Sequence, residues 1–156
     1  MQGEERVDRE LLDAAALAGH LIPPNSMFAF LAARRAELFP DEDFADLFPS
    51  GRGRPSIPAS VMAAVLTLQA LHDYPDRETA EAVCFDVRWK AAIGAPLDYA
   101  GFGPSALAYW RGRVARPERP HRINEAVRTV VTQTGILAGR RRRAVDSTIL
   151  ADAVVI

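Results

Sequence analysis

The residues best suited to chemistry lie near the end of the printed sequence, where four consecutive arginines (Arg140, Arg141, Arg142 and Arg143) precede a single carboxylate, Asp146. The segment 144–150 is short, apolar and rich in β-branched residues, which predicts a strand. A carboxylate on a strand can bind Mg²⁺, and guanidinium groups bind phosphate. The pattern therefore fits metal-dependent chemistry on a phosphate-containing substrate. The alternative is structural: Asp146 ends a strand or caps a turn, and the arginines form a solvated linker.

A second group of candidate residues belongs to a helix predicted from Ala106 to Val114. Ser105 stands directly before this helix and is expected to cap it, because a serine oxygen accepts a free backbone N–H of the first turn. At 100° per residue, Leu107, Trp110 and Val114 fall on one side of the helix. We expect that side to face the core.

The opposite side of this helix carries Tyr109 and Arg113, together with Arg116 if the helix continues that far. An aromatic ring and two guanidinium groups on the exposed face of a helix, reached through short helices and tight turns, are typical of the recognition helix of a helix-turn-helix unit. The alternative is an ordinary solvated face on which Tyr109 packs against Arg113.

A third candidate is the basic segment 50–56, in which Arg52, Gly53, Arg54 and Pro55 match the core of a minor-groove AT-hook. In such a hook an extended Arg-Gly-Arg segment lies in a narrow A·T groove. The match is short and lacks flanking basic clusters, so a plain flexible linker is the alternative.

The elements that must position these residues are predicted to be helical. The expected ranges are about 7–18, 26–39, a helical turn over 41–48, 58–74, 76–85, 87–93, 106–114 and 122–134, the last closed by Gly135. The third full helix, 58–74, should be central and buried on most sides. Asn25 or Ser26 and Asp76 are expected to cap the helices that follow them, and Arg35 is expected to point outward. The fold class predicted is mainly α, a helical bundle.

The charge distribution divides the chain in two. Residues 1–50 hold 4 Arg and 10 Asp or Glu, a formal charge of −6, whereas residues 51–156 hold 15 Lys or Arg and 10 acids, a formal charge of +5. The second part is thus the candidate surface for a polyanion. The acidic stretch 41–48 is interpreted as a solvated face, with a regulatory contact to the basic half as the alternative.

Several classes of protein are disfavoured by what the sequence lacks. The charged N-terminus has no apolar signal region, and the longest uncharged run, 57–71, is too short to cross a bilayer. The three histidines match no metal-ligand spacing, and no glycine-rich phosphate loop or nucleophile elbow occurs. One cysteine, Cys84, is expected to be an inert core residue. We therefore expect a cytoplasmic protein with no membrane partner.

Several motifs recur in a recognisable order from about Leu21 onward. They are Gly53-Arg-Pro55, Pro58 with the helix after it, Tyr74-Pro-Asp-Arg-Glu-Thr79, the helix containing Trp89, Phe102-Gly-Pro-Ser105, Trp110-Arg-Gly-Arg113 and Val145-Asp-Ser-Thr148. In this order and spacing the chain resembles the bacterial insertion-sequence transposases that carry an InsH-type helical N-terminal domain before a DDE catalytic domain.

The resemblance implies roles for particular residues. Asp146 would lie on the first strand of an RNase H-like domain, as the first member of an Asp-Asp-Glu triad that binds Mg²⁺. Ser105, Trp110, Arg111 and Arg113 would match the family's serine and its basic aromatic helix. The family's second Asp and its Glu lie well downstream on other strands, and Asp152 is too close to Asp146 to replace them. The expected domains are therefore a helical DNA-binding domain, 1–138, and the start of a truncated RNase H-like domain, 139–156, with no tight Mg²⁺ binding and no activity in this chain alone.

Two functions follow as hypotheses. The first is the DNA-binding part of a transposase, which contacts duplex phosphates through Tyr109, Arg111, Arg113 and Arg116 and through the arginines 140–143. The second is an inert remnant that acts as a helical protein-interaction module or transposase inhibitor, binding itself or a full-length transposase through the unpaired edge of the strand 144–150. A nuclease that uses Asp146 alone is disfavoured, because one carboxylate holds Mg²⁺ weakly.

Overall fold

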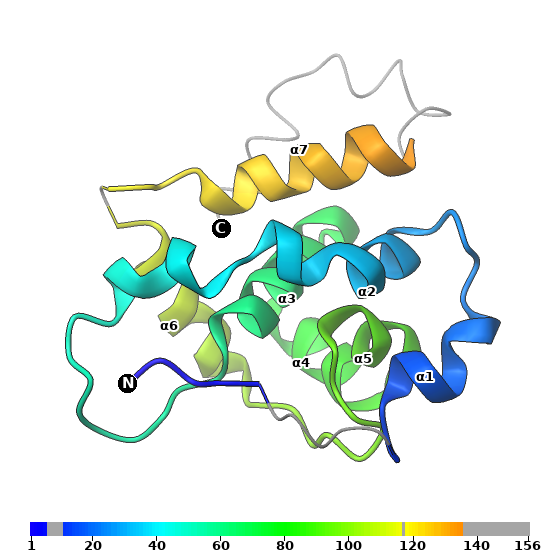
Figure 1. The fold of residues 1–156 in the computed structure, drawn as a ribbon, viewed down its shortest axis with the longest axis horizontal. Coiled ribbons are helices and arrows are strands. Elements are labelled where there is room, and N and C mark those ends of the chain that lie inside the picture. Colours follow the sequence, from blue (N-terminus) through cyan, green and yellow to red (C-terminus); the bar gives the residue numbers. More distant parts are fainter. Residues whose placement is uncertain (6–10, 117, 136–156) are drawn as a thin grey trace.

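The computed structural model describes residues 1–5, 11–116 and 118–135, and these form a helical bundle, as predicted (Figure 1). The described α-helices are α1 (Ala14–Ala18), α2 (Met27–Leu38), α3 (Ala59–His72), α4 (Asp76–Phe85), α5 (Val87–Ile93), α6 (Pro104–Val114) and α7 (Arg122–Thr134), with 3₁₀ helices η1 (Gly19–Leu21) and η2 (Asp41–Leu47). Among the described residues, β-type pairing is limited to isolated bridges between Gly3 and Pro58 and between Asp13 and Pro96. The predicted strand and the predicted second domain lie outside them.

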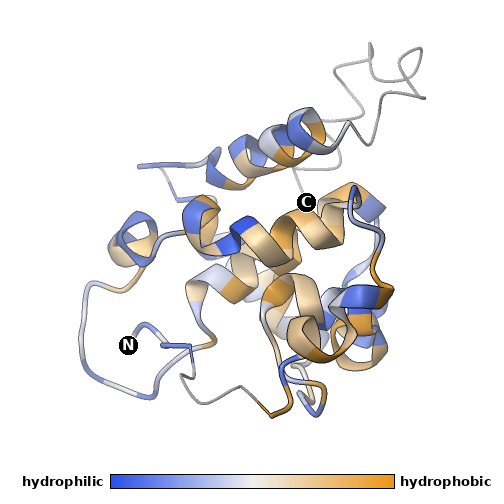
Figure 2. Ribbon diagram, turned by 45° about the vertical axis from the view of Figure 1, so that its right-hand side comes forward, coloured by the Kyte–Doolittle hydropathy of each residue, from blue (hydrophilic) through white to orange (hydrophobic). Residues whose placement is uncertain are grey.

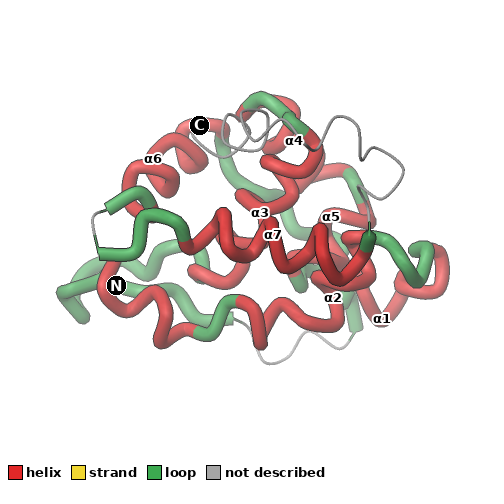
Figure 3. The backbone as a smooth tube through the Cα atoms, turned by 90° about the horizontal axis from the view of Figure 1, so that it is seen from above, coloured by secondary structure: helices red, strands yellow, loops and turns green. Residues whose placement is uncertain are grey.

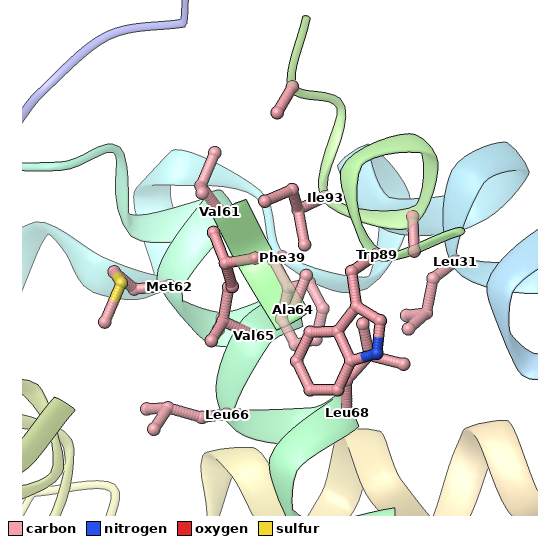
Figure 4. Packing of buried hydrophobic residues seen from close by; sticks show 14 of the residues in the cluster. Leu31, Phe39, Val61, Met62, Ala64, Val65, Leu66, Leu68, Trp89 and Ile93 are labelled. Carbon is pink, nitrogen blue, oxygen red and sulfur yellow. The ribbon is translucent and has the colours of Figure 1, made fainter. Parts of the chain in front are cut away.

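Helix α3 is the centre of the bundle. Every residue from Ala59 to Ala70 is buried, so this helix is enclosed on all sides, in agreement with the prediction of a central helix buried on most sides. Helices α2, α4, α5, α6 and α7 all pack against it, and Figure 2 shows the hydrophobic colouring that it shares with the inner sides of its neighbours. In Figure 4 its side chains meet Trp89 and Ile93 of α5 and Leu31 of α2, each of which is fully buried.

Helix α7 covers one side of this core and is amphipathic. Ala126, Val127 and Val130 form its buried face, and it packs across α2 and α3 (Figure 3). Gly135 ends the helix in the left-handed conformation, with φ 62°, as predicted. Helices α1 and α6 lie at opposite ends of the molecule in both Figure 1 and Figure 3.

Two of the three predicted helix caps are wrong. Ser26 does cap α2, since its Oγ accepts a hydrogen bond from the Ala29 N–H at 3.2 Å. In contrast, α6 begins two residues earlier than predicted, at Pro104 instead of Ala106, so that Ser105 lies inside the first turn and provides no cap. A proline is favourable there because it has no N–H to satisfy. Asp76 likewise lies inside α4, and its carboxylate binds other groups.

Three further local predictions differ from the structure. Helix α1 is described only from Ala14, and Asp13 caps it by accepting hydrogen bonds from Ala15 and Ala16 N–H. Arg35 does not point outward: it is 9% exposed and forms an ion pair with Glu5 at 2.8 Å, a partner thirty residues away that helical periodicity cannot indicate. Cys84 is half-buried instead of belonging to the core.

Candidate nucleic-acid interface

The inner face of α6 is fixed in the core. Leu107, Trp110 and Val114 are buried, as the wheel predicts. The Trp110 ring also packs against Phe48, at the end of η2, with ring centroids 5.6 Å apart. Because the inner face is anchored at three points along the helix, the side chains on the outer face have a defined direction.

The outer face of α6 carries an arginine held between two aromatic rings. The guanidinium carbon of Arg113 lies 4.8 Å from the centroid of the Phe48 ring and 5.0 Å from that of Tyr109. Tyr109 is 56% exposed, and Ser105, one turn earlier, is also exposed. Aromatic faces attract a guanidinium group and limit its rotamers while leaving its N–H donors available. The contact between Tyr109 and Arg113 was foreseen in the solvated-face interpretation and is equally compatible with a DNA-binding face.

Arg116 extends this face beyond the end of the helix. Helix α6 ends at Val114, so Arg116 does not share its helical register. The Arg116 N–H still donates to the Arg113 carbonyl at 3.2 Å, which keeps the chain turning after the helix. Tyr109 and Arg116 are exposed and Arg113 is half-buried, so all three side chains are accessible to solvent at least in part.

Arg111 has a different environment from the one that DNA binding would require. Its guanidinium forms two hydrogen bonds with the Asp76 carboxylate, at 2.5 and 2.8 Å, and a longer one with Gln69 Oε1 at 3.4 Å. The Arg111 side chain is 19% exposed. Hydrogen bonds from Arg111, and then from Gln69, hold the pKa of Asp76 below its ordinary value. This pair fastens α6 to the start of α4 and leaves little of the Arg111 charge for another anion.

The acidic helix η2 contacts two arginines of the basic half. Arg122 donates to both carboxylate oxygens of Asp46, at 3.0 and 2.8 Å, and to the Asp43 carbonyl at 2.7 Å. Hydrogen bonding from Arg122 lowers the pKa of Asp46. Arg119 pairs with the Asp43 carboxylate at 3.0 Å. The acidic stretch therefore contacts the basic half, and Phe44 and Leu47 are buried beneath it. A regulatory role for this contact stays a prediction.

The AT-hook-like segment leaves η2 directly after Phe48. Arg52, Gly53 and Arg54 are all exposed, and Gly53 has φ 108°, a conformation that other residues rarely adopt. Arg54 borders a cavity of about 630 Å³ together with Glu4, Glu5 and Asp98. Those carboxylates disfavour a phosphate on that side of Arg54, so DNA would have to approach from the opposite side.

The remaining candidates cannot be placed. Asp146 and the four arginines 140–143 lie outside the described residues. Within the described residues, no group of three or more His, Cys, Asp or Glu side chains could hold a metal ion. Over the same residues, no helix has the length and apolar character needed to cross a membrane.

Two residues of this surface escaped prediction from the sequence. Phe48 ends the stretch 41–48, and its contact with Arg113 joins positions 65 apart in the chain, which no local pattern indicates. Arg119 lies after the helix predicted to end at Val114 and was not among the candidate residues. The signal that could have pointed to it is the regular spacing of three residues in Arg113, Arg116 and Arg119.

The fold and this surface define a mainly helical domain that presents a cationic, partly aromatic face at one end. A family model described as Transposase domain (DUF772) matches residues 17–113, which is more than half of the chain. The protein therefore belongs to this transposase-domain family, and the match runs from α1 to Arg113 of α6. No curated protein and no solved structure is significantly similar to the chain.

Proposed function

We propose that this chain is the N-terminal DNA-binding part of a transposase that in its full-length form cuts and joins DNA at the ends of an insertion sequence. The supporting observation is the exposed face of α6, on which Arg113 is held between Phe48 and Tyr109, in a protein of a transposase family. A cation already held in place loses little conformational freedom when it binds phosphate.

The physical basis of this binding is contact with the DNA backbone. Arg113 and Arg116 offer guanidinium groups to phosphates, and the Tyr109 and Ser105 hydroxyls are positioned to donate hydrogen bonds on the same face. Arg111 contributes by fixing α6 on α4 through Asp76, so its role is positioning. Helices α4 to α6 would serve as the helix-turn-helix-like unit, with α6 as the reading helix.

The other sequence candidates extend the proposal. Arg52 and Arg54 would reach a groove or the backbone beside η2, and Arg140, Arg141, Arg142 and Arg143 would add phosphate contacts. Asp146 would be the inherited ligand for Mg²⁺, which supplies Lewis-acid activation of a phosphodiester when it is bound.

The experiment is a titration of the full chain with duplex DNA at several salt concentrations. Each phosphate contact that an arginine makes adds about 0.9 to the slope of log K against log salt. We expect an Arg113→Ala, Arg116→Ala variant to lose affinity and about two units of slope. Arg128→Ala, which removes an exposed arginine of α7, is the matched control and should retain the wild-type slope. Equal losses in both variants, or binding that does not depend on salt, would refute the proposal.

The alternative function is a helical protein-interaction module that binds a second copy or a full-length transposase. Exposed apolar side chains favour it, because Leu11 is 89%, Phe85 80% and Leu21 73% exposed. Sedimentation decides between the two: self-association together with no DNA binding at low salt would support the alternative.

A further inference from the structure

Arg119 lies in the connection between α6 and α7, three positions after Arg116. Its guanidinium is 3.0 Å from the Asp43 carboxylate, and the two side chains are 46% and 43% exposed. An ion pair so open to water contributes little to folding, because solvent screens it and two long side chains must be held in one geometry. Arg119 can therefore change its partner at small cost.

The neighbouring pair shows the opposite character. The Arg122 side chain is 3% exposed, forms two hydrogen bonds with Asp46, and lies over the Phe44 ring at 5.5 Å. Removing Arg122 from this contact would leave a charge buried without a partner. Of the two arginines that bind η2, Arg122 is structural and Arg119 is exchangeable.

Helix η2 and the residue after it lie directly beside the cationic face of α6. Phe48 contacts Arg113, and Asp43 contacts Arg119, so the same short acidic segment touches both ends of the strip Arg113, Arg116, Arg119. Three residues of chain span at most about 11 Å, so Arg116 and Arg119 lie close enough to meet one DNA backbone. A DNA strand on α6 would therefore approach Asp43 as well.

We propose that Arg119 is a further phosphate-binding residue of the α6 surface and that Asp43 is its resident counter-ion, which a DNA phosphate displaces. This inference rests on the proposed function. In free protein Asp43 keeps Arg119 in place. On binding, the Asp43 carboxylate loses its partner beside a polyanion, and this lowers the affinity for DNA.

The test is a set of duplex-DNA titrations of the full chain at low salt. Asp43→Asn should raise the affinity about two- to fivefold, the range that an exposed ion pair allows. Arg119→Ala should lower the affinity and reduce the salt slope by about 0.9. In the Asp43→Asn, Arg119→Ala double variant the gain from Asp43→Asn should disappear. The Arg122 contact with Asp43 survives all of these changes, because it uses the backbone carbonyl.

The matched control is Glu42→Gln. Glu42 is an exposed acid of the same helix and, within the described part of the chain, pairs with no arginine. Glu42→Gln removes one negative charge, as Asp43→Asn does, so its effect on affinity measures only the general repulsion between acidic side chains and DNA. An equal gain from Glu42→Gln, or a gain from Asp43→Asn that persists without Arg119, would overturn the inference.

Failure of the proposed function gives a different result. If wild-type protein binds DNA and the Arg113→Ala, Arg116→Ala variant loses affinity and salt slope as expected, an Asp43→Asn variant with wild-type DNA affinity overturns this inference only. If wild-type protein does not bind duplex DNA at low salt, both are refuted. A thermal-unfolding curve for each variant shows whether it is folded during the titration.

Discussion

Replacement of Arg111 by alanine separates a structural arginine from the DNA-binding ones on the same helix. Of the two arginines of α6, Arg111 is the one that pairs with an internal carboxylate, with two hydrogen bonds to Asp76 and 19% exposure of its side chain. We expect Arg111→Ala to destabilise the protein substantially. We expect Arg113→Ala, whose side chain contacts two rings at the surface, to do so only slightly.

The magnitude follows from the exposure of the pair. Hydrogen bonds to charged groups contribute about 1.5–3 kcal/mol, and breaking a fully buried pair costs about 3–5 kcal/mol. The Asp76 carboxylate is 28% exposed, so water can partly replace the lost guanidinium. We therefore expect a loss of about 2 kcal/mol, which corresponds to a fall in Tm of about 4–8 °C for a chain of this size.

The assay is a double-mutant cycle measured by urea unfolding. Wild-type, Arg111→Ala, Asp76→Asn and the double variant should give a coupling free energy of about 1–2 kcal/mol. At a temperature well below unfolding, Arg111→Ala should keep the wild-type salt slope for DNA, whereas Arg113→Ala should lose about 0.9 of it. If Arg111→Ala has wild-type stability and loses a DNA contact, the structural role of Arg111 is wrong, because Arg111 would then face the DNA.

Three further predictions concern stability. The pKa values of Asp46 and Asp76 lie below their ordinary values because arginines donate hydrogen bonds to them. The stability that they contribute is complete above the unfolded value of about 3.9 and is lost as the pH falls through the lower folded values. Urea unfolding at several pH values should show this loss of stability in acid. In Asp76→Asn the free energy of unfolding should depend less on pH. The same pH dependence in the variant and in the wild type would contradict the role of Asp76. Arg122→Ala should cost about 2–3 kcal/mol in the same assay, since it removes the hydrogen bonds to Asp46 and to the Asp43 carbonyl together with the contact over Phe44, and a loss below about 1 kcal/mol would show that the pair is solvated. Gly94→Ala should lower Tm, because Gly94 has φ 71° and an added Cβ would collide with the Arg35 guanidinium, whereas an unchanged Tm would show that Arg35 moves freely.

The helices whose signals are local were predicted well from the sequence. The boundaries of α5 and α7 follow from apolar periodicity and from the glycines that end them, and both have the predicted ranges. Helix α3 was predicted as central because its apolar residues cover more than one face of the helix. Periodicity and stop signals act within a few residues, so one sequence is sufficient to read them.

The ion pairs that join these helices could not be predicted in the same way. Arg111 meets Asp76 across 35 positions, and Arg122 meets Asp46 across 76. Helical periodicity gives the side of a helix on which an arginine lies, but it does not give the neighbour on that side. The candidate site shows the same limit, since the Tyr109 and Arg113 contact within one turn was predictable, whereas the Phe48 contact was not.

The most direct test of the central claim is an NMR titration of ¹⁵N-labelled full chain with duplex DNA at low salt. We expect amide shifts and exchange broadening to concentrate on residues 105–116 and on Arg119, with little change in α1 at the opposite end of the molecule. Shifts that concentrate on α1 or around Phe85 while α6 remains unchanged would contradict it, and would place the binding surface on the exposed apolar side chains instead.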